Sequence, residues 1–128
     1  MANTNFNMNI TSEYLRANPN HIFVFGDNLL RKGKGGAAAL RDHYNTYGFI
    51  TKKAPNNREE SFYTPEEYIP VYEQEVDRLF DYAKGNPSLF LISPIGAGLA
   101  NKYGIFDQII QPNIKDDLSG VENIQFLF

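Results

Sequence analysis

Short apolar runs alternate with helix-forming segments along the whole chain, and this alternation limits the possible folds more than any other feature. The apolar runs are rich in β-branched and aromatic residues, as buried strands are, and they occupy residues 21–25, 48–51, 88–92 and 121–128. Strands that alternate with helices form a largely parallel or mixed sheet covered by helices. We therefore expect an α/β domain with right-handed crossovers and a central sheet flanked by helices.

The chain length favours one domain. A chain of 128 residues is long enough to bury a core and too short for two ordinary domains, so we expect a single domain over residues 1–128. The first eight residues are polar, and we expect them to be flexible. The sequence carries no signal of oligomeric state.

The clearest helix signal begins at Thr64, which is followed by Pro65 and, three residues after the threonine, by Glu67. This pattern is a capping box with proline at the first helical position. An apolar stripe at helical spacing follows, and Gly85 ends the pattern. The stripe consists of Tyr68, Tyr72, Val76, Leu79, Phe80 and Ala83, and the mainly opposite, polar face carries Glu73, Glu75, Asp77, Arg78 and Asp81.

Three shorter helices are also predicted. Thr11 or Ser12 can cap a helix that runs through Asn18, with Glu13 in its first turn. The alanine-rich residues 37–44 predict a helix that opens just after Gly35 and Gly36, because alanine is the best helix former. Residues 105–110 predict another short helix.

Composition excludes several classes of function. The chain has no cysteine and two histidines, which excludes disulfides, thiolate metal sites and a cysteine nucleophile, and we expect neither a metal nor a cofactor. The net charge of −3 and the pI near 5.3 argue against binding to bulk nucleic acid. The longest mostly apolar run, residues 88–100, contains a proline and is too short to span a membrane. No secretory signal is visible, so we expect a cytoplasmic protein, in the host cytoplasm if the chain is viral.

Two glycine-rich segments follow apolar strands. We call residues 26–37 the first glycine segment and residues 95–100 the second glycine segment. Ligands of open α/β sheets bind at the carboxyl ends of strands, where glycines let main-chain N–H groups approach an anion closely. The helix expected after Gly36 would add unpaired N–H donors. Arg31, Lys32 and Lys34 add positive charge, so this pattern predicts a cradle for a phosphate-bearing ligand.

Other nucleotide and hydrolase motifs do not fit. Residues 33–38 match G-x-G-x-x-A, but a dinucleotide fold needs this motif directly after the first strand, and seven residues intervene here. The chain contains no Walker motif and no G-x-S-x-G nucleophile elbow.

Three motifs in this order resemble macro domains: Phe25-Gly-Asp-Asn28, Gly33-Lys-Gly-Gly-Ala-Ala-Ala39 and Ser93-Pro-Ile-Gly-Ala-Gly-Leu99. The chain looks most like a compact macro-like family of phages and bacteria, over roughly residues 20–115. The resemblance implies a macro-like fold in which two glycine loops hold the diphosphate and distal ribose of ADP-ribose. It also implies that Asn28 contacts the ribose.

Loop chemistry and resemblance together predict a site for an ADP-ribose-like nucleotide. Tyr103 is included because it could stack on a base or a ribose. The predicted ligand-binding residues are Gly26, Asp27, Asn28, Gly33, Lys34, Gly35, Gly36, Ala37, Ile95, Gly96, Ala97, Gly98, Leu99 and Tyr103. Such a protein would read ADP-ribosylated targets or remove a signalling nucleotide.

Two other functions stay open at this point. In an ADP-ribosyl hydrolase, Asp27 would be the general base, Asn28 would orient the ribose and Lys34 would be an alternative nucleophile. In a structural or interaction domain, the glycine segments would bind no ligand. Binding without catalysis needs the fewest assumptions.

Overall fold

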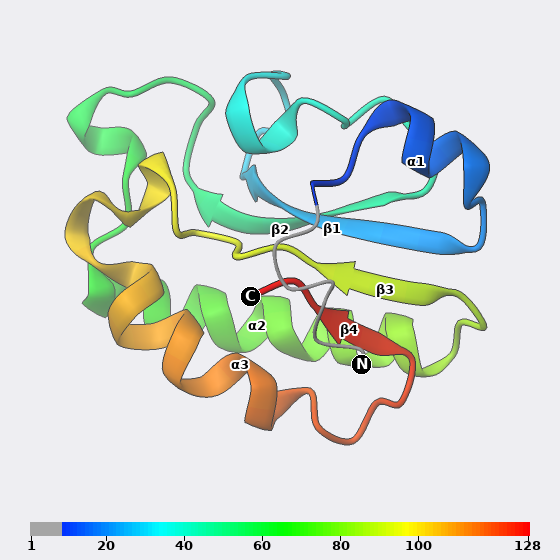
Figure 1. Cartoon of the computed structure of the whole chain (residues 1–128). Helices are drawn as coiled ribbons and strands as arrows, with labels where there is room; N and C mark the ends of the chain where they lie inside the picture. Colours follow the sequence, from blue (N-terminus) through cyan, green and yellow to red (C-terminus); the bar gives the residue numbers. More distant parts are fainter. Residues whose placement is uncertain (1–8) are drawn as a thin grey trace.

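Four parallel strands form the centre of the computed structural model, which describes residues 9–128 (Figure 1). The expectation of flexibility for residues 1–8 lies outside the described residues. The strands pair in the order β2-β1-β3-β4, and every pairing is parallel. Their bounds are His21–Asn28 (β1), Thr46–Lys52 (β2), Leu89–Ile92 (β3) and Ile124–Phe126 (β4). The predicted α/β class is confirmed, with a parallel rather than a mixed sheet.

The strand order creates a switch point between β1 and β3. From β1 the chain passes to β2 on one side, and from β2 it returns across the sheet to β3 and then to β4. Crossover connections share one handedness, so two crossovers that run in opposite directions along the sheet cover opposite faces of it. Accordingly, α1 (Ser12–Ala17) and the 29–45 connection cover one face, and α2 (Pro65–Lys84) and α3 (Gln111–Asp117) cover the other (Figure 1). Ligands of open α/β sheets bind at such a switch point.

Helix α2 packs its predicted apolar stripe against the sheet. Thr64 and Glu67 form the expected capping box, and the helix runs unbroken through Pro70. Phe80 is half-buried, whereas the other members of the stripe are buried. Full burial of an aromatic or leucine side chain stabilises a fold by about 1.5–3 kcal/mol, so this stripe is a large part of the core.

Glu75 was predicted on the polar face of this helix, and its position in the structure corrects that prediction. Its side chain is buried, and its Oε1 accepts hydrogen bonds from the Ile50 main-chain N–H at 2.8 Å and from Arg78 Nη2 at 2.9 Å. Because β2 is an edge strand, the Ile50 N–H has no neighbouring strand to bond, and the carboxylate of Glu75 takes that place.

The alanine-rich segment also differs from the prediction. Only Gly36–Ala38 are helical, as a single 3-10 turn (η2), and turns follow up to β2. The predicted eight-residue helix is marginal without tertiary packing, and among residues 36–39 only Ala38 is buried. Alanine propensity therefore does not decide this segment, and no helix N-terminus is available there for an anion.

The C-terminal helix is longer than expected. The π-helical turn η5 (Phe106–Ile110) continues directly into α3, which contains Pro112 in its first turn. Pro112 has no N–H to donate, and it lies at the junction where the π-helical turn gives way to the α-helix. The predicted final strand shortens to β4. Among residues 9–128, no helix has the combination of length and apolar character required to cross a membrane.

Candidate functional site

The two glycine segments lie side by side at the carboxyl ends of β1 and β3. A Cβ atom added to Gly26 would lie 3.6 Å from the Gly96 main-chain nitrogen and 3.2 Å from Thr51 Oγ1. Gly26 belongs to β1 itself rather than to a following loop, because β1 continues to Asn28. Gly96 has a φ of +84°, in the left-handed region that favours glycine. Glycine thus leaves room for Thr51 beside Gly26 and for the buried Ile110 side chain beside Gly96.

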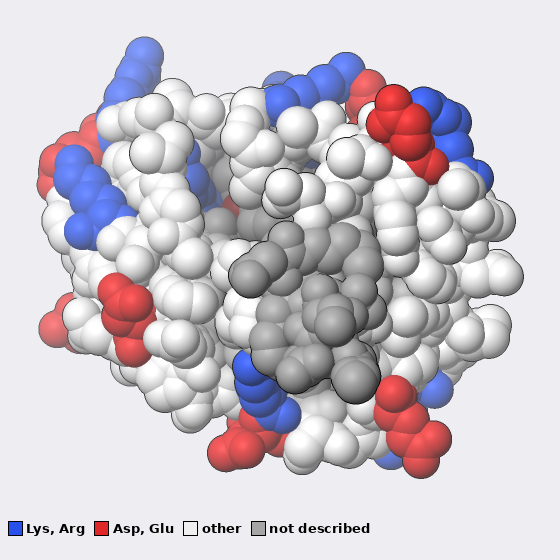
Figure 2. Space-filling view, in the orientation of Figure 1, with Lys and Arg blue, Asp and Glu red and all other residues white. Residues whose placement is uncertain are grey.

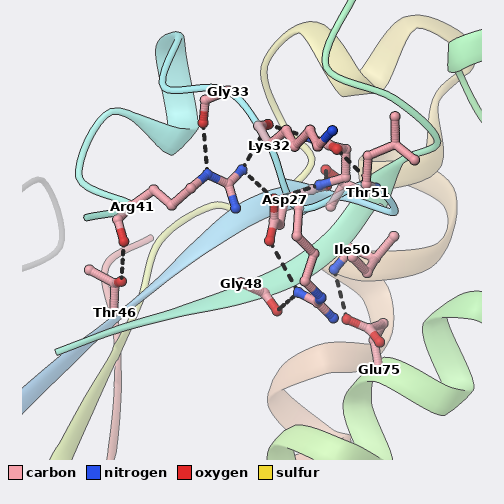
Figure 3. Close-up of polar contacts among 12 residues, drawn as sticks. Asp27, Lys32, Gly33, Arg41, Thr46, Gly48, Ile50, Thr51 and Glu75 are labelled. Atoms are coloured by element: carbon pink, nitrogen blue, oxygen red, sulfur yellow. Dashed lines mark hydrogen bonds and ion pairs between the residues drawn. The ribbon is translucent and has the colours of Figure 1, made fainter. Parts of the chain in front are cut away.

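Asp27 organises the first glycine segment (Figure 3). Its side chain is 2% exposed, and its Oδ1 accepts hydrogen bonds from Arg41 Nη2 at 2.5 Å and from the Asn28 N–H at 2.8 Å. Its Oδ2 accepts from Arg31 Nη1 at 3.1 Å. A Cβ atom on Gly48 would lie 2.9 Å from Asp27 Cγ, so the carboxylate occupies space that only glycine leaves free. Both carboxylate oxygens are engaged within the chain.

Arg41 and Asn28 fix the loop that follows β1. Arg41 donates to the Gly33 carbonyl at 2.7 Å and to the Lys32 carbonyl at 3.1 Å (Figure 3). Asn28 Nδ2 donates to the same Lys32 carbonyl at 2.8 Å, and its Oδ1 accepts from the Leu30 N–H at 3.1 Å. These contacts hold residues 29–33 in a defined loop, although none of them belongs to a helix or strand ladder.

A hollow of about 500 Å³, here called the first hollow, lies between the first glycine segment and the end of β3. Gly36 and Ala37 form one wall, and Ser93 and Pro94 form another. Phe23, Leu40 and Leu127 make its lining largely apolar, and Asn9, Ile10 and Ala39 complete it.

The second glycine segment contributes to a different hollow. Ala97, Gly98 and Leu99 face Asn57 and Phe62 across a space of about 470 Å³, here called the second hollow. Asn101 and Lys102 complete its lining. Among the predicted ligand-binding residues, Gly36 and Ala37 line the first hollow, and Ala97, Gly98 and Leu99 line the second. The other predicted residues line neither hollow, so the predicted set does not form one cleft.

Basic residues gather around this edge. Residues 27–62 and 99–103 contain eight lysines and arginines and four acidic residues, although the whole chain has a net charge of −3. Figure 2 shows the surface hollowed in this region, with basic side chains on the walls of the hollow. Two of the four carboxylates form exposed ion pairs, Lys34 with Asp42 and Lys102 with Glu59, and exposed pairs contribute little free energy. The local excess of positive charge favours an anionic ligand.

Three predicted site residues have distinct environments. Ile95 is only 2% exposed and belongs to the core, so its side chain cannot reach a ligand. Lys34 is exposed and pairs with Asp42. Tyr103 is half-buried and lies edge-on to Phe62, with ring centroids 6.5 Å apart.

The glycine segments also offer main-chain donors. Among the described residues, the N–H groups of Gly35, Gly96 and Gly98 donate to no other group. Unpaired N–H groups in such a loop can bind an anion. Within residues 9–128, no group of three histidine, aspartate or glutamate side chains is placed to hold a metal ion.

Sequence reasoning placed neither Arg41 nor Lys52 in the site. Arg41 lies in the segment that was expected to be helical, 14 residues from Asp27, and nothing in the sequence links the two. Lys52 ends β2 at the carboxyl edge, and this position was its only signal. Burial lowers the pKa of Lys52 below its usual value, because a desolvated ammonium group is less stable.

A family model described as "Family of unknown function (DUF7831)" matches residues 5–101 of the chain. The protein belongs to this family. The match covers both glycine segments and every described element from α1 to β3. No curated protein and no solved structure matches the DUF7831 protein.

Proposed function

We propose that this DUF7831 protein binds an ADP-ribose-like nucleotide at the carboxyl ends of β1 and β3. The observation that carries the proposal is the adjacency of the two glycine segments at the switch point of a parallel sheet, where Gly26 approaches the Gly96 nitrogen. A diphosphate bound there would accept hydrogen bonds from free N–H groups of both segments.

The shape and charge of the edge support the same ligand class. The apolar lining of the first hollow, with Phe23 and Leu40, suits a nucleobase or the carbon face of a ribose. The excess of basic residues suits a phosphorylated compound. The order of the three macro-like motifs favours ADP-ribose and its derivatives among nucleotides. We propose a macro-like domain that acts as a reader of ADP-ribosylated targets or as a sink for a signalling nucleotide.

Binding is favoured over hydrolysis by the environment of Asp27. A general base must reach a proton of the substrate or of a water, but both oxygens of Asp27 accept hydrogen bonds from arginines and its side chain is 2% exposed. Lys34, the alternative nucleophile, lies at the surface in an ion pair with Asp42. These environments favour a protein that binds the nucleotide over one that hydrolyses it.

Thermal unfolding with a panel of ADP-ribose, NAD, cyclic ADP-ribose and cyclic dinucleotides tests the proposal. A ligand at 100 times its Kd stabilises the folded state by about 2.7 kcal/mol, which raises the Tm of a domain this size by several degrees. No shift with any member of the panel would contradict the proposal and favour a structural or interaction domain.

Glycine variants locate the site. The Cβ added by Gly98→Val meets no atom within 4 Å and lies beside the free N–H of Gly98, so the larger side chain should hinder an anion from reaching that N–H. The Tm of the unliganded variant shows whether it is folded. Gly85→Val, at the opposite edge of the sheet after α2, is the matched control. We expect Gly98→Val to lose the ligand-induced shift and Gly85→Val to keep it. Equal shifts in both variants would remove the second glycine segment from the site.

A further inference from the structure

Lys52 lies where three segments of the chain meet. Its carbonyl accepts a hydrogen bond from the Leu29 N–H at 3.0 Å, which joins it to the loop after β1. It also forms an isolated antiparallel bridge with Phe62, next to a hydrogen bond of 2.8 Å from the Lys53 N–H to the Ser61 carbonyl. The main chain at Lys52 is thus fixed from both sides.

A bulge in β2 sets the direction of this side chain. Asp27 pairs with Ile50, but the next residue, Asn28, pairs with Lys52, so Thr51 is an extra residue in the edge strand. A bulge changes the face to which the following side chain points, and bulges occur frequently beside functional sites. Thr51 is itself anchored, because its Oγ1 donates to the Asp27 carbonyl at 3.3 Å.

The ammonium group of Lys52 has weak partners. Its Nζ donates to Asn57 Oδ1 at 3.1 Å and lies 5.0 Å from the centroid of the Phe62 ring. Among the described residues it forms no ion pair, whereas the adjacent Lys53 pairs with Glu67 at 3.1 Å. Partial burial without a carboxylate is costly, and the lowered pKa of Lys52 reflects that cost. The N–H donors not used by Asn57 remain for an anion.

A second cation borders the same ring. Lys102 Nζ lies 5.1 Å from the centroid of the Phe62 ring, and Lys102 and Gly98 both line the second hollow. The ion pair of Lys102 with Glu59 is exposed, so an incoming anion can replace it at little cost. Lys102 and the free N–H of Gly98 therefore border the second hollow, and the ammonium group of Lys52 contacts two of its lining residues, Asn57 and Phe62.

We propose that the second hollow is a phosphomonoester subsite in which Lys52 and Lys102 bind a phosphate at the end of the ligand remote from the first hollow. The inference rests on the proposed function and deepens it, because it assigns the ligand a direction. The apolar first hollow would take the base or ribose. The basic second hollow would take the phosphomonoester of an ADP-ribose derivative that carries one, a group that ADP-ribose itself lacks.

Titration of ribose 5-phosphate, followed by its ³¹P chemical shift, tests the subsite without a nucleobase. Lys52→Gln and Lys102→Gln should each weaken binding by about 10- to 100-fold, the effect of one lost charge-assisted hydrogen bond. Glu59→Gln should tighten binding, because it frees Lys102 from its carboxylate partner. Lys84→Gln is the matched control. The Nζ atom of Lys84 lies 5.3 Å from the centroid of the Phe80 ring, but at the end of α2, remote from the carboxyl ends of the strands.

The outcomes separate this inference from the proposed function. Loss of the ³¹P shift in Lys52→Gln, with a retained Tm shift from ADP-ribose, supports both. Equal binding of ribose 5-phosphate by the wild-type protein, Lys52→Gln and Lys84→Gln overturns the subsite alone. A wild-type protein that responds to neither ribose 5-phosphate nor any nucleotide overturns both proposals. The Tm of each unliganded variant shows whether it is folded.

Discussion

The two glycine segments are neighbours at one edge of the sheet, but different forces hold them. The first depends on polar contacts, chiefly the buried carboxylate of Asp27 with Arg31 and Arg41. The second depends on apolar packing, because Ile95 is buried and a Cβ added to Gly96 would meet Ile110 Cδ1 at 2.7 Å. One wall of the proposed site is therefore continuous with the core, and the other is attached to it by a few ionic contacts.

This difference has consequences for stability and for ligand binding. A change at Ile95 or Gly96, in the part of the second segment that contacts the core, must disturb the packing between the sheet and η5, which is shared by the whole domain. A change in the first segment breaks contacts that involve little buried apolar surface, because residues 29–37 are all exposed. We expect the second segment to set the stability of the fold and the first to adjust to the ligand.

The largest effect is expected from Gly96→Ala. The positive φ of Gly96 costs any other residue about 1–2 kcal/mol, and overlap with Ile110, which is fully buried, adds to this cost. We expect a loss of about 3 kcal/mol in the free energy of unfolding, measured by urea denaturation. A loss below about 1 kcal/mol would show that the second segment is not fixed by the core.

A smaller effect is expected from Asp27→Asn. The change leaves Arg41 without its carboxylate, and breaking a buried ion pair costs about 3–5 kcal/mol. Because the Arg31 side chain is 46% exposed and can be hydrated, we expect a smaller loss, of about 2 kcal/mol, in the free energy of unfolding. Amide hydrogen exchange should accelerate in residues 29–41 while α2 stays protected.

Asp42→Asn is the matched control, because Asp42 lies in the connection after β1 and forms an exposed ion pair with Lys34 of the first glycine segment. Loss of this pair should lower the free energy of unfolding by between about 0 and 1 kcal/mol. Equal losses for Asp27→Asn and Asp42→Asn would mean that the ionic contacts of Asp27 do not hold the first segment. Uniform acceleration of exchange across the domain in Asp27→Asn would mean that the segment is not separable from the core.

The parts of the fold that follow local rules were predictable from the sequence. The strands around Phe23, Phe49 and Phe90 and the capped helix from Pro65 follow from apolar runs and the capping box, which are signals within a few residues. The prediction of a helix in the alanine-rich segment was wrong. Helix propensity competes with tertiary packing, and this segment buries little surface. Glu75 was misplaced because its partner, the Ile50 N–H, is 25 residues away.

The candidate site was likewise predictable from the sequence only in its local features. Glycines after apolar strands predicted that both segments lie at the carboxyl ends of the strands, and the fold brings them together there. The separation into two hollows was not predictable, because it depends on the 57–62 loop, which the sequence marks only as polar. The bulge that directs Lys52 depends on the register between β1 and β2, which no local pattern encodes.

The most direct test of a shared site is a ¹H–¹⁵N NMR titration with ADP-ribose. The amide signals of Gly35, Gly96 and Gly98, whose N–H groups donate to no other described residue, should shift together and yield a single Kd. Shifts confined to one segment, shifts that fit different dissociation constants, or shifts only in the groove between α2 and α3 would contradict a site shared by the two glycine segments.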